Sequence, residues 1–315
     1  MIPRAYIQEW SQTAPWPDAA QVEQDLIICR ALCDLFRDDW LAERLAFRGG
    51  TAIHKLLFVR PLRYSEDIDL IQLQPGPIGK TVDAIRSALD WLGPCKREPA
   101  SHSMHLTFRF APEGELNSKR KIKVEINTRE HTSFFPVRRY PFKVDSAWYS
   151  GKVDIVSFDP EELFGTKFRA LLQRRKNRDL FDLSEGLKQL SMDSDKLIKC
   201  FEHYLGLEGV IIGRAAAEQR LLEQRERSLT EDVVPLLPAG ITFSDDEAVA
   251  AIERIWHDLV PRLRGEAAIA WRFVRRRDYT TEAIKNPSRE SRAYKLAMAQ
   301  QGTACRSEFQ NLGCL

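Results

Sequence analysis

Two aspartates separated by one residue, in Asp67-Ile68-Asp69, form the pair whose spacing best fits chemistry. The segment 65–73 alternates in polarity and is rich in isoleucine and leucine, which predicts a β-strand. Residues i and i+2 of a strand point to the same face with Cα atoms roughly 6.5–7 Å apart, so both carboxylates could reach one divalent ion. Magnesium prefers such oxygen ligands, together with substrate phosphates. The pair indicates metal-assisted phosphoryl or nucleotidyl transfer, and a solvated strand edge is the alternative.

A pair of glycines upstream could supply the complementary feature, a place for a phosphate. Gly49-Gly50 precedes a short helix predicted to run to about Phe58, and Thr51 adds a hydroxyl near its start. Backbone without side chains lets N–H groups approach a phosphate, and the positive end of a helix favours the anion. A tight turn would explain the glycines taken alone. Beside the aspartate pair, binding of a nucleotide phosphate is the favoured interpretation.

A third carboxylate is predicted on a neighbouring strand. Residues 120–128 alternate between apolar and polar side chains, and Glu125 lies on the polar face. In two-metal chemistry such a residue can bind a second ion or act as a base. The alternative is a surface glutamate paired with Lys121 or Lys123.

A helix is predicted from Asp159-Pro160-Glu161-Glu162, which combines a cap, a proline at the first helical position and acids in the first turn. Along it, four side chains would share one face of a continuous helix: Lys167, Arg174, Arg178 and Asp182. The lysine could neutralise a triphosphate and the arginines could clamp phosphates. Asp179 and Asp182 could pair with Arg178 or orient Lys167. A solvated basic helix end is the alternative.

A mixed framework is needed to bring these residues together. Residues 19–46 are predicted to form one long amphipathic helix, and residues 78–92 another. Strands are predicted at 104–110 and 120–128, joined as an antiparallel hairpin, and two strand-like pieces within 134–158. The rest of the chain is helical to about residue 277. The predicted domains are a mixed α/β core with its N-terminal helix at 1–158, a helical domain that supplies the lysine at 159–286, and a tail at 287–315.

The composition is that of a globular protein with a hydrophobic core, since 43% of the 315 residues are hydrophobic and 29% are charged. No apolar run approaches the roughly 20 residues of a membrane helix, and the N-terminus has no apolar stretch of signal-peptide length. We therefore expect a cytoplasmic protein without a membrane partner. The net charge of +2 says nothing about nucleic acid, so local clusters must carry that argument. These clusters are Lys119-Arg120-Lys121 with Lys123, Arg138-Arg139, the helix 167–178, and Arg272 with Arg275-Arg276-Arg277.

Two blocks of sequence resemble the AbiEii/AbiGii-type nucleotidyltransferase toxins, a family that includes the MenT toxins. The first block contains Arg48-Gly49-Gly50-Thr51-Ala52 and Arg63-Tyr64-Ser65-Glu66-Asp67-Ile68-Asp69. The second contains Glu162-Leu163-Phe164-Gly165-Thr166-Lys167 and Arg178-Asp179-Leu180-Phe181-Asp182. The resemblance implies an α+β fold, a polymerase-β-like nucleotidyltransferase core with a mixed sheet, followed by a helical C-terminal domain.

The resemblance also implies a function. Studied members of the family add nucleotides from an NTP to the 3′ acceptor end of tRNA, which blocks translation, and they belong to toxin–antitoxin or phage-defence pairs. We therefore expect a metal-dependent toxin that uses Mg²⁺ (or Mn²⁺), acts on tRNA and is neutralised by a cognate antitoxin, AbiEi-like or kinase-like. The alternatives are transfer of a nucleotide or phosphate to a protein hydroxyl, and a non-catalytic RNA- or partner-binding module on the same scaffold.

Roles follow from the resemblance residue by residue. The expected catalytic residues are Asp67, Asp69, Glu125, Lys167 and Asp182, of which Asp67, Asp69 and Glu125 are the expected metal ligands. The expected nucleotide-binding residues are Gly49, Gly50, Thr51, Ser65, Arg178 and Asp179. Glu125 stands where many polymerase-β-like enzymes have an aspartate. Ser65 matches a serine that some antitoxins phosphorylate, and a phosphate there would add negative charge beside the metal carboxylates.

Overall fold

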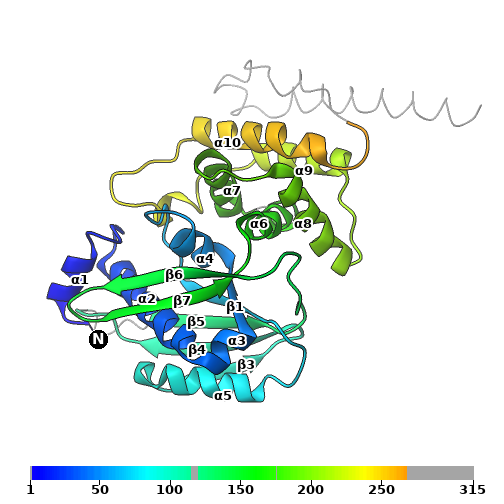
Figure 1. Ribbon diagram of the computed structural model, residues 1–315. Coiled ribbons are helices and arrows are strands. Elements are labelled where there is room, and N and C mark those ends of the chain that lie inside the picture. The colour runs from blue at the N-terminus through cyan, green and yellow to red at the C-terminus, as the bar shows by residue number, and fades with distance from the viewer. Residues whose placement is uncertain (1, 115–119, 175, 268–315) are drawn as a thin grey trace, which may run out of the picture. The chain divides into compact units, whose positions relative to one another are not determined.

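The computed structural model describes residues 2–114, 120–174 and 176–267 (Figure 1). The described residues belong to one compact unit. Several sequence predictions lie outside them: the tail 287–315, the last part of the helical domain (268–286), Lys119, Arg272 and Arg275-Arg276-Arg277.

A mixed sheet of seven strands carries the first half of the chain, in the order β3-β4-β5-β2-β1-β7-β6. The strands are β1 Leu45–Arg48, β2 Asp67–Gln72, β3 Cys95–Pro99, β4 Ser103–Phe110, β5 Arg120–Asn127, β6 Arg138–Asp145 and β7 Ser150–Ser157. β2 pairs parallel with β5, and β1 pairs parallel with β7, while the other neighbours are antiparallel. The α+β fold with a mixed sheet and the 104–110/120–128 hairpin are therefore confirmed.

The two faces of β4, β5 and β2 differ in polarity. Leu106, Val124 and Ile68 lie in register on neighbouring strands and are fully buried. On the opposite face, Asp67 and Asp69 lie beside Lys123 and Glu125 of β5. Strand alternation therefore places the predicted carboxylates together, because each strand must bury its apolar side.

Helices on the sheet depart from the sequence prediction at one point. Helix α2 (Ala19–Arg37) packs against β7 and β6, and it ends where Asp38 adopts an extended backbone. The Asp38 carboxylate accepts a hydrogen bond from the Leu41 N–H and so begins the short helix α3 (Asp39–Arg44). The chain then enters β1. The prediction of a single helix over 19–46 is wrong, because α2 ends at Arg37 and Asp38 caps a second helix, α3.

The edge strand β3 was not anticipated. Its residues, Cys-Lys-Arg-Glu-Pro, are mostly exposed and have no apolar alternation, so no period-2 pattern marks them. The predicted helix over 78–92 is present as α5 (Gly79–Ala88) followed by a 3₁₀ turn, η1 (Asp90–Leu92). A short helix, α1 (Arg4–Trp10), precedes α2.

The second half of the described chain is helical. Its elements are α6 Pro160–Arg174, α7 Asn177–Gln189, α8 Ser194–Leu207, α9 Arg214–Arg225 and α10 Asp245–Asp258, with 3₁₀ turns η2 Val234–Leu236 and η3 Val260–Arg262. Helix α6 packs against α7, α8 and α4 (Gly49–Leu56), the helix that follows the glycine pair (Figure 1). No helix among the described residues is long and apolar enough to span a membrane.

One continuous helix from Lys167 to Asp182 is not formed. Helix α6 ends at Arg174 and α7 begins at Asn177, so these residues belong to two packed helices. The prediction that Lys167, Arg174, Arg178 and Asp182 share one helix face is therefore wrong. Lys167 and Asp182 nevertheless meet, because α7 packs against α6.

Candidate active site

Gly49 and Gly50 pack so closely against neighbouring side chains that neither position has room for a Cβ atom. Gly49 has a φ of 80°, and a Cβ added there would lie 2.0 Å from Oδ2 of Asp69. A Cβ at Gly50 would lie 2.6 Å from Nη2 of Arg63 and 3.6 Å from Oδ2 of Asp182. Two adjacent glycines thus touch the two acidic parts of the site, one at Asp69 and the other at Asp182.

Replacing Gly49 by alanine is expected to cost about 1–3 kcal/mol of unfolding free energy, because the positive φ is strained for alanine and the methyl group displaces Asp69. The effect is measured by denaturant unfolding. Gly206→Ala is the matched control, since Gly206 lies in α8 with open space around it and alanine favours helix. A Gly49→Ala protein as stable as the wild type would contradict the tight contact.

Asp67 and Asp69 are partly buried and lie on one side of β2. Burial raises the pKa of Asp67 to about 6, and the nearby charges of Asp69 and Glu66 add to the effect. Burial also raises the pKa of Asp69, reinforced by Glu125 and opposed by Arg48 and Lys167. The fold therefore holds two carboxylates together at a free-energy cost to their ionised forms.

This cost predicts a pH dependence of stability for the metal-free protein. A carboxyl whose pKa is raised by folding stabilises the protein fully below its unfolded value of 3.8, and this stabilisation is lost as the pH rises through about 6. Asp67→Asn should remove this component. We expect the unfolding free energy of the wild type, minus that of Asp67→Asn, to fall between pH 4 and pH 6 in urea titrations with chelator. A difference that rises with pH would contradict the burial argument.

The aspartate pair fits a divalent cation. The influences on both carboxyls are burial and neighbouring charge, and within the described residues neither side chain has a hydrogen-bond or ion-pair partner in the protein. A cation held by Asp67 and Asp69 would relieve the repulsion between them and supply the positive charge that phosphate chemistry needs.

Glu125 is differently placed. It lies beside Asp69 in the sheet register, but its Oε2 accepts a 2.6 Å bond from Nζ of Lys123 and lies 3.4 Å from Nε2 of His105. Although burial opposes ionisation, these partners lower the pKa of Glu125. No group of three acidic, histidine or cysteine ligands able to hold a metal is found in the described part of the chain. Of the two interpretations of Glu125, the structure contains the ion pair with Lys123. Metal binding by Glu125 stays a prediction.

Lys167 lies buried between two aspartates of α7. Its Nζ is 2.9 Å from Oδ1 of Asp179 and 3.0 Å from Oδ2 of Asp182. Burial opposes a charged amine, yet the two carboxylates raise the pKa of Lys167. The charge of Lys167 also opposes the raised pKa of Asp69, one of the two expected metal ligands. The break between α6 and α7 is what turns both aspartates back onto the lysine.

Asp182 is fully buried and its carboxylate is saturated. Arg63 donates two bonds of 2.6 Å to it, and Nε2 of His54 lies 2.9 Å away. The Leu62 N–H donates to Nδ1 of His54, so Nε2 carries the ring proton and donates to Asp182. Burial lowers the pKa of His54, which agrees with a neutral ring. Despite its burial, the pKa of Asp182 is held well below its ordinary value by Arg63, Lys167 and His54.

The hydroxyls at the turn bond to each other. Thr51 Oγ1 donates to the main-chain oxygen of Asp67 at 2.6 Å, so it accepts from Ser65 Oγ, 2.7 Å away. Thr51 is buried, and Ser65 is partly exposed. Both residues therefore brace the start of β2, and Ser65 is the one open to solvent. Arg178 is exposed on α7.

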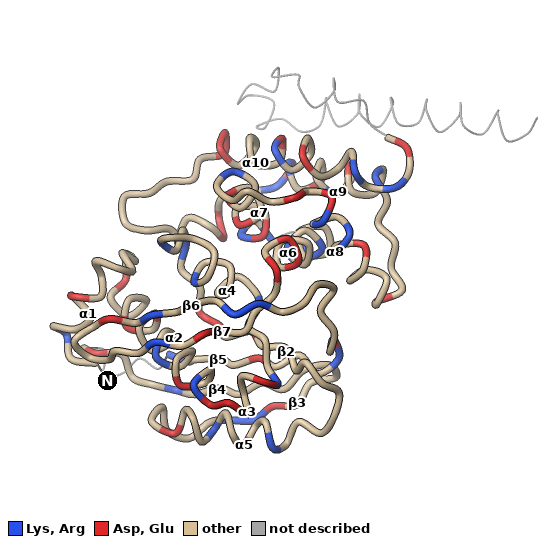
Figure 2. The backbone as a smooth tube through the Cα atoms, in the orientation of Figure 1, with Lys and Arg blue, Asp and Glu red and all other residues tan. Residues whose placement is uncertain are grey.

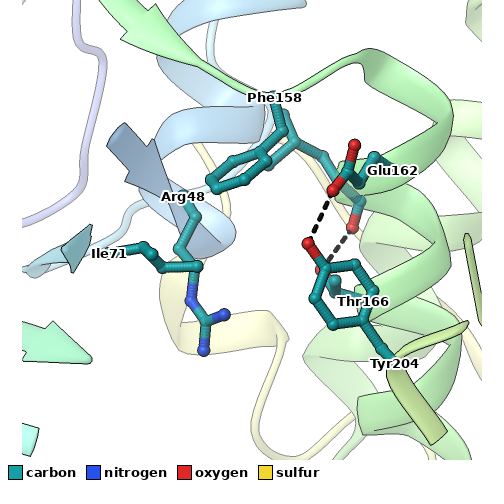
Figure 3. A pocket seen from close by; sticks show the side chains of 7 residues that line it. Arg48, Ile71, Phe158, Glu162, Thr166 and Tyr204 are labelled. Atoms are coloured by element: carbon teal, nitrogen blue, oxygen red, sulfur yellow. Dashed lines mark hydrogen bonds between the residues drawn. The ribbon is translucent and has the colours of Figure 1, made fainter. Parts of the chain in front are cut away.

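A joint between the sheet and α6 completes the surroundings. Glu130 accepts from Nη1 of Arg48 at 2.6 Å and from Nη1 of Arg169 at 3.0 Å, which ties β1 to the helix that carries Lys167. Figure 3 shows Arg48 facing Phe158, Glu162 and Tyr204 across a small pocket. This pocket is too narrow to hold a water molecule, so it is a packed joint rather than a ligand site.

Four residues of this framework were not singled out from the sequence: His54, Arg63, Glu130 and Arg169. Arg63 and His54 fall within or beside the first block that resembles the family, yet no local spacing marks them as partners of Asp182. Their roles depend on contacts between distant segments.

The fold is similar to that of solved structures. It matches MenT4, a nucleotidyltransferase toxin from Mycobacterium tuberculosis, with a TM-score of 0.63 and 16% identity, covering 91% of this chain and 98% of that one. JHP933 from Helicobacter pylori matches with a TM-score of 0.47 and 16% identity, covering 78% of this chain and 96% of that one. No curated protein matches the sequence.

The class of protein is given by a family model that matches most of the chain, and it is a nucleotidyltransferase. The model of the family "Nucleotidyl transferase AbiEii toxin, Type IV TA system" matches residues 30–273. The chain therefore belongs to the AbiEii family of nucleotidyltransferase toxins, and a toxin of a toxin–antitoxin system has an antitoxin as its partner.

Proposed function

We propose that this toxin transfers nucleotides from an NTP to the 3′ acceptor end of tRNA, with Mg²⁺ or Mn²⁺ as cofactor, and so blocks translation. The observation that carries the proposal is the convergence of three features: the Asp67/Asp69 pair, the glycine turn whose two residues lie against Asp69 and Asp182, and the amine of Lys167, 3.0 Å from Oδ2 of Asp182. These are the parts that a nucleotide triphosphate and its metal require.

The residues divide the work by their chemistry. Asp67 and Asp69 would hold the cation, which supplies charge neutralisation and orients the reacting oxygens when bound. Gly49 and Gly50 are partly exposed at the N-terminus of α4, where main-chain N–H groups would bind a phosphate. Lys167 would bind the triphosphate. Asp179 holds its amine through Oδ1, while Oδ2 of Asp179 lies 3.7 Å from Nη2 of the exposed Arg174. Asp182 would keep the lysine in place.

Ser65 offers a route for neutralisation by an antitoxin. Its hydroxyl is partly exposed and bonds to Thr51 directly beside Asp67. A phosphate on Ser65 would break that bond and add negative charge next to carboxylates whose pKa values are already raised. A kinase-like antitoxin would act in this way, whereas an AbiEi-like partner would act by binding. Phage defence in the bacterial cytoplasm is the corresponding biological role.

A labelling assay tests the proposal. Purified protein is incubated with each of the four labelled NTPs, Mg²⁺, and either total tRNA or tRNA-free lysate protein, and the label is followed on gels. We expect one NTP or a subset to label tRNA, and chelation of the metal to stop labelling. Label in the protein fraction alone would support transfer to a protein hydroxyl and contradict the proposal. NTP binding without any transfer would indicate a binding module.

A further inference from the structure

The polar face of β4 and β5 carries two cations where strand pairing should avoid them. Arg109 and Lys121 lie directly opposite each other in the antiparallel register, and both side chains are exposed. Like charges in this arrangement destabilise a sheet. Neither has an acidic ion-pair partner among the described residues, whereas Arg120 next to them bonds Asp18 and Lys123 bonds Glu125.

A second pair of opposed cations in the same sheet shows the contrast. Lys143 and Lys152 face each other on β6 and β7, but Asp145 forms an ion pair with Lys143. Within the described ranges, neither Arg109 nor Lys121 forms such an ion pair. Figure 2 shows basic and acidic residues interspersed over the described chain, so the position of the uncompensated cations is more informative than their number.

The sheet register connects the pair to the expected metal site. Lys121 is two residues before Lys123, which lies opposite Asp67, and all three are on the polar face. Lys121 and Lys123 are among the charges that act on Asp67. The uncompensated pair therefore begins a polar path along β5 that ends at the aspartates.

The strand order separates this path from the nucleotide-binding residues. In the order β4-β5-β2-β1, the Arg109–Lys121 pair lies on one side of β2, while the glycine turn after β1 lies on the other. In nucleotidyl transfer the attacking and leaving oxygens are roughly in line, so the two substrates must approach the reacting phosphate from opposite directions. The β1 side suits the triphosphate, and the β4–β5 side is left for the acceptor.

We propose that Arg109 and Lys121 bind the phosphate backbone of the RNA acceptor and direct its end along β5 to Asp67 and Asp69. This inference rests on the proposed function and adds the surface by which the RNA is held. The contacts would be to phosphates and therefore independent of sequence. Bound phosphates would then supply the ion-pair partners that Arg109 and Lys121 lack among the described residues.

Charge reversal separates this role from a structural one. Arg109→Glu and Lys121→Glu each place opposite charges across the strand pair, so unfolding free energy should stay equal or rise. Binding of fluorescently labelled total tRNA should weaken at least ~10-fold for Arg109→Glu, and the slope of log affinity against log salt should fall by about 1 or more. Lys152→Glu is the matched control, because it makes the same charge change opposite Lys143, and its affinity should stay within about twofold.

The outcomes are distinguishable from failure of the proposed function. If the wild type labels tRNA but Arg109→Glu binds it as tightly as the wild type, the RNA surface is wrong and the function stands. Equal weakening by Lys152→Glu would show a net-charge effect and would overturn the inference. NTP affinity should be unchanged in Arg109→Glu, since the nucleotide binds on the β1 side. If the wild type labels only protein, both the proposed function and this surface fail.

Discussion

Asp69→Asn is expected to lower nucleotide transfer by at least about 1,000-fold while leaving the protein folded. Asparagine keeps the shape that fits against Gly49 but removes the charge that would bind the cation. Because burial raises the pKa of Asp69, its ionised form is disfavoured by the fold, and the neutral variant should be at least as stable near pH 7. Labelled-NTP transfer to tRNA and denaturant unfolding measure the two effects.

The control for this variant is Asp154→Asn, which makes the same change at an exposed position of β7 in the same sheet. It should keep wild-type transfer. If Asp69→Asn retained more than a tenth of the activity, the aspartate pair would not be the metal site. Loss of both activity and stability would instead show that Asp69 supports the turn.

Asp182→Ala is expected to destabilise the protein by about 3–5 kcal/mol, because it leaves buried cationic and polar groups without their shared partner. Arg63 is 3% exposed and loses both of its bonds to the carboxylate, and Lys167 loses one of its two acidic partners. The unfolding free energy from urea titration at pH 7 measures the effect. We expect Asp182 to act as a positioning residue for Lys167.

An exposed ion pair provides the comparison. Asp145→Ala removes the partner of Lys143, and both side chains are largely exposed, so its cost should stay below about 1 kcal/mol. An Asp182→Ala protein with near-wild-type stability would contradict the saturated, buried arrangement. A catalytic role alone, without the structural one, would leave the unfolding free energy unchanged and affect transfer only.

The features that could be predicted from the sequence are those set by neighbours along the chain. The hairpin of β4 and β5 follows from alternation over eight residues in each strand. The shared face of Asp67 and Asp69 follows from the two-residue period of a strand. The glycine turn and the helix after it also depend on local backbone freedom, and Gly49 has the positive φ that such a turn needs.

The predictions that failed depended on where a regular pattern is interrupted. The apolar periodicity over 19–46 continues through Asp38, where the side chain caps a new helix instead of extending the old one. The spacing from Lys167 to Asp182 gives no sign of the break between α6 and α7. Edge strand β3 is exposed, so burial imposes no pattern on it.

By itself, the sequence determined which side chains share a strand face and where the chain can turn, because these depend on the backbone period and on glycine. The tertiary structure decided which distant partners meet: Arg63 and His54 at Asp182, and Arg48 and Arg169 at Glu130. These pairings join segments far apart in the chain. They are set by the packing of α6 against α4 and α7 and by the need of each buried charge for a partner, and local spacing predicts neither.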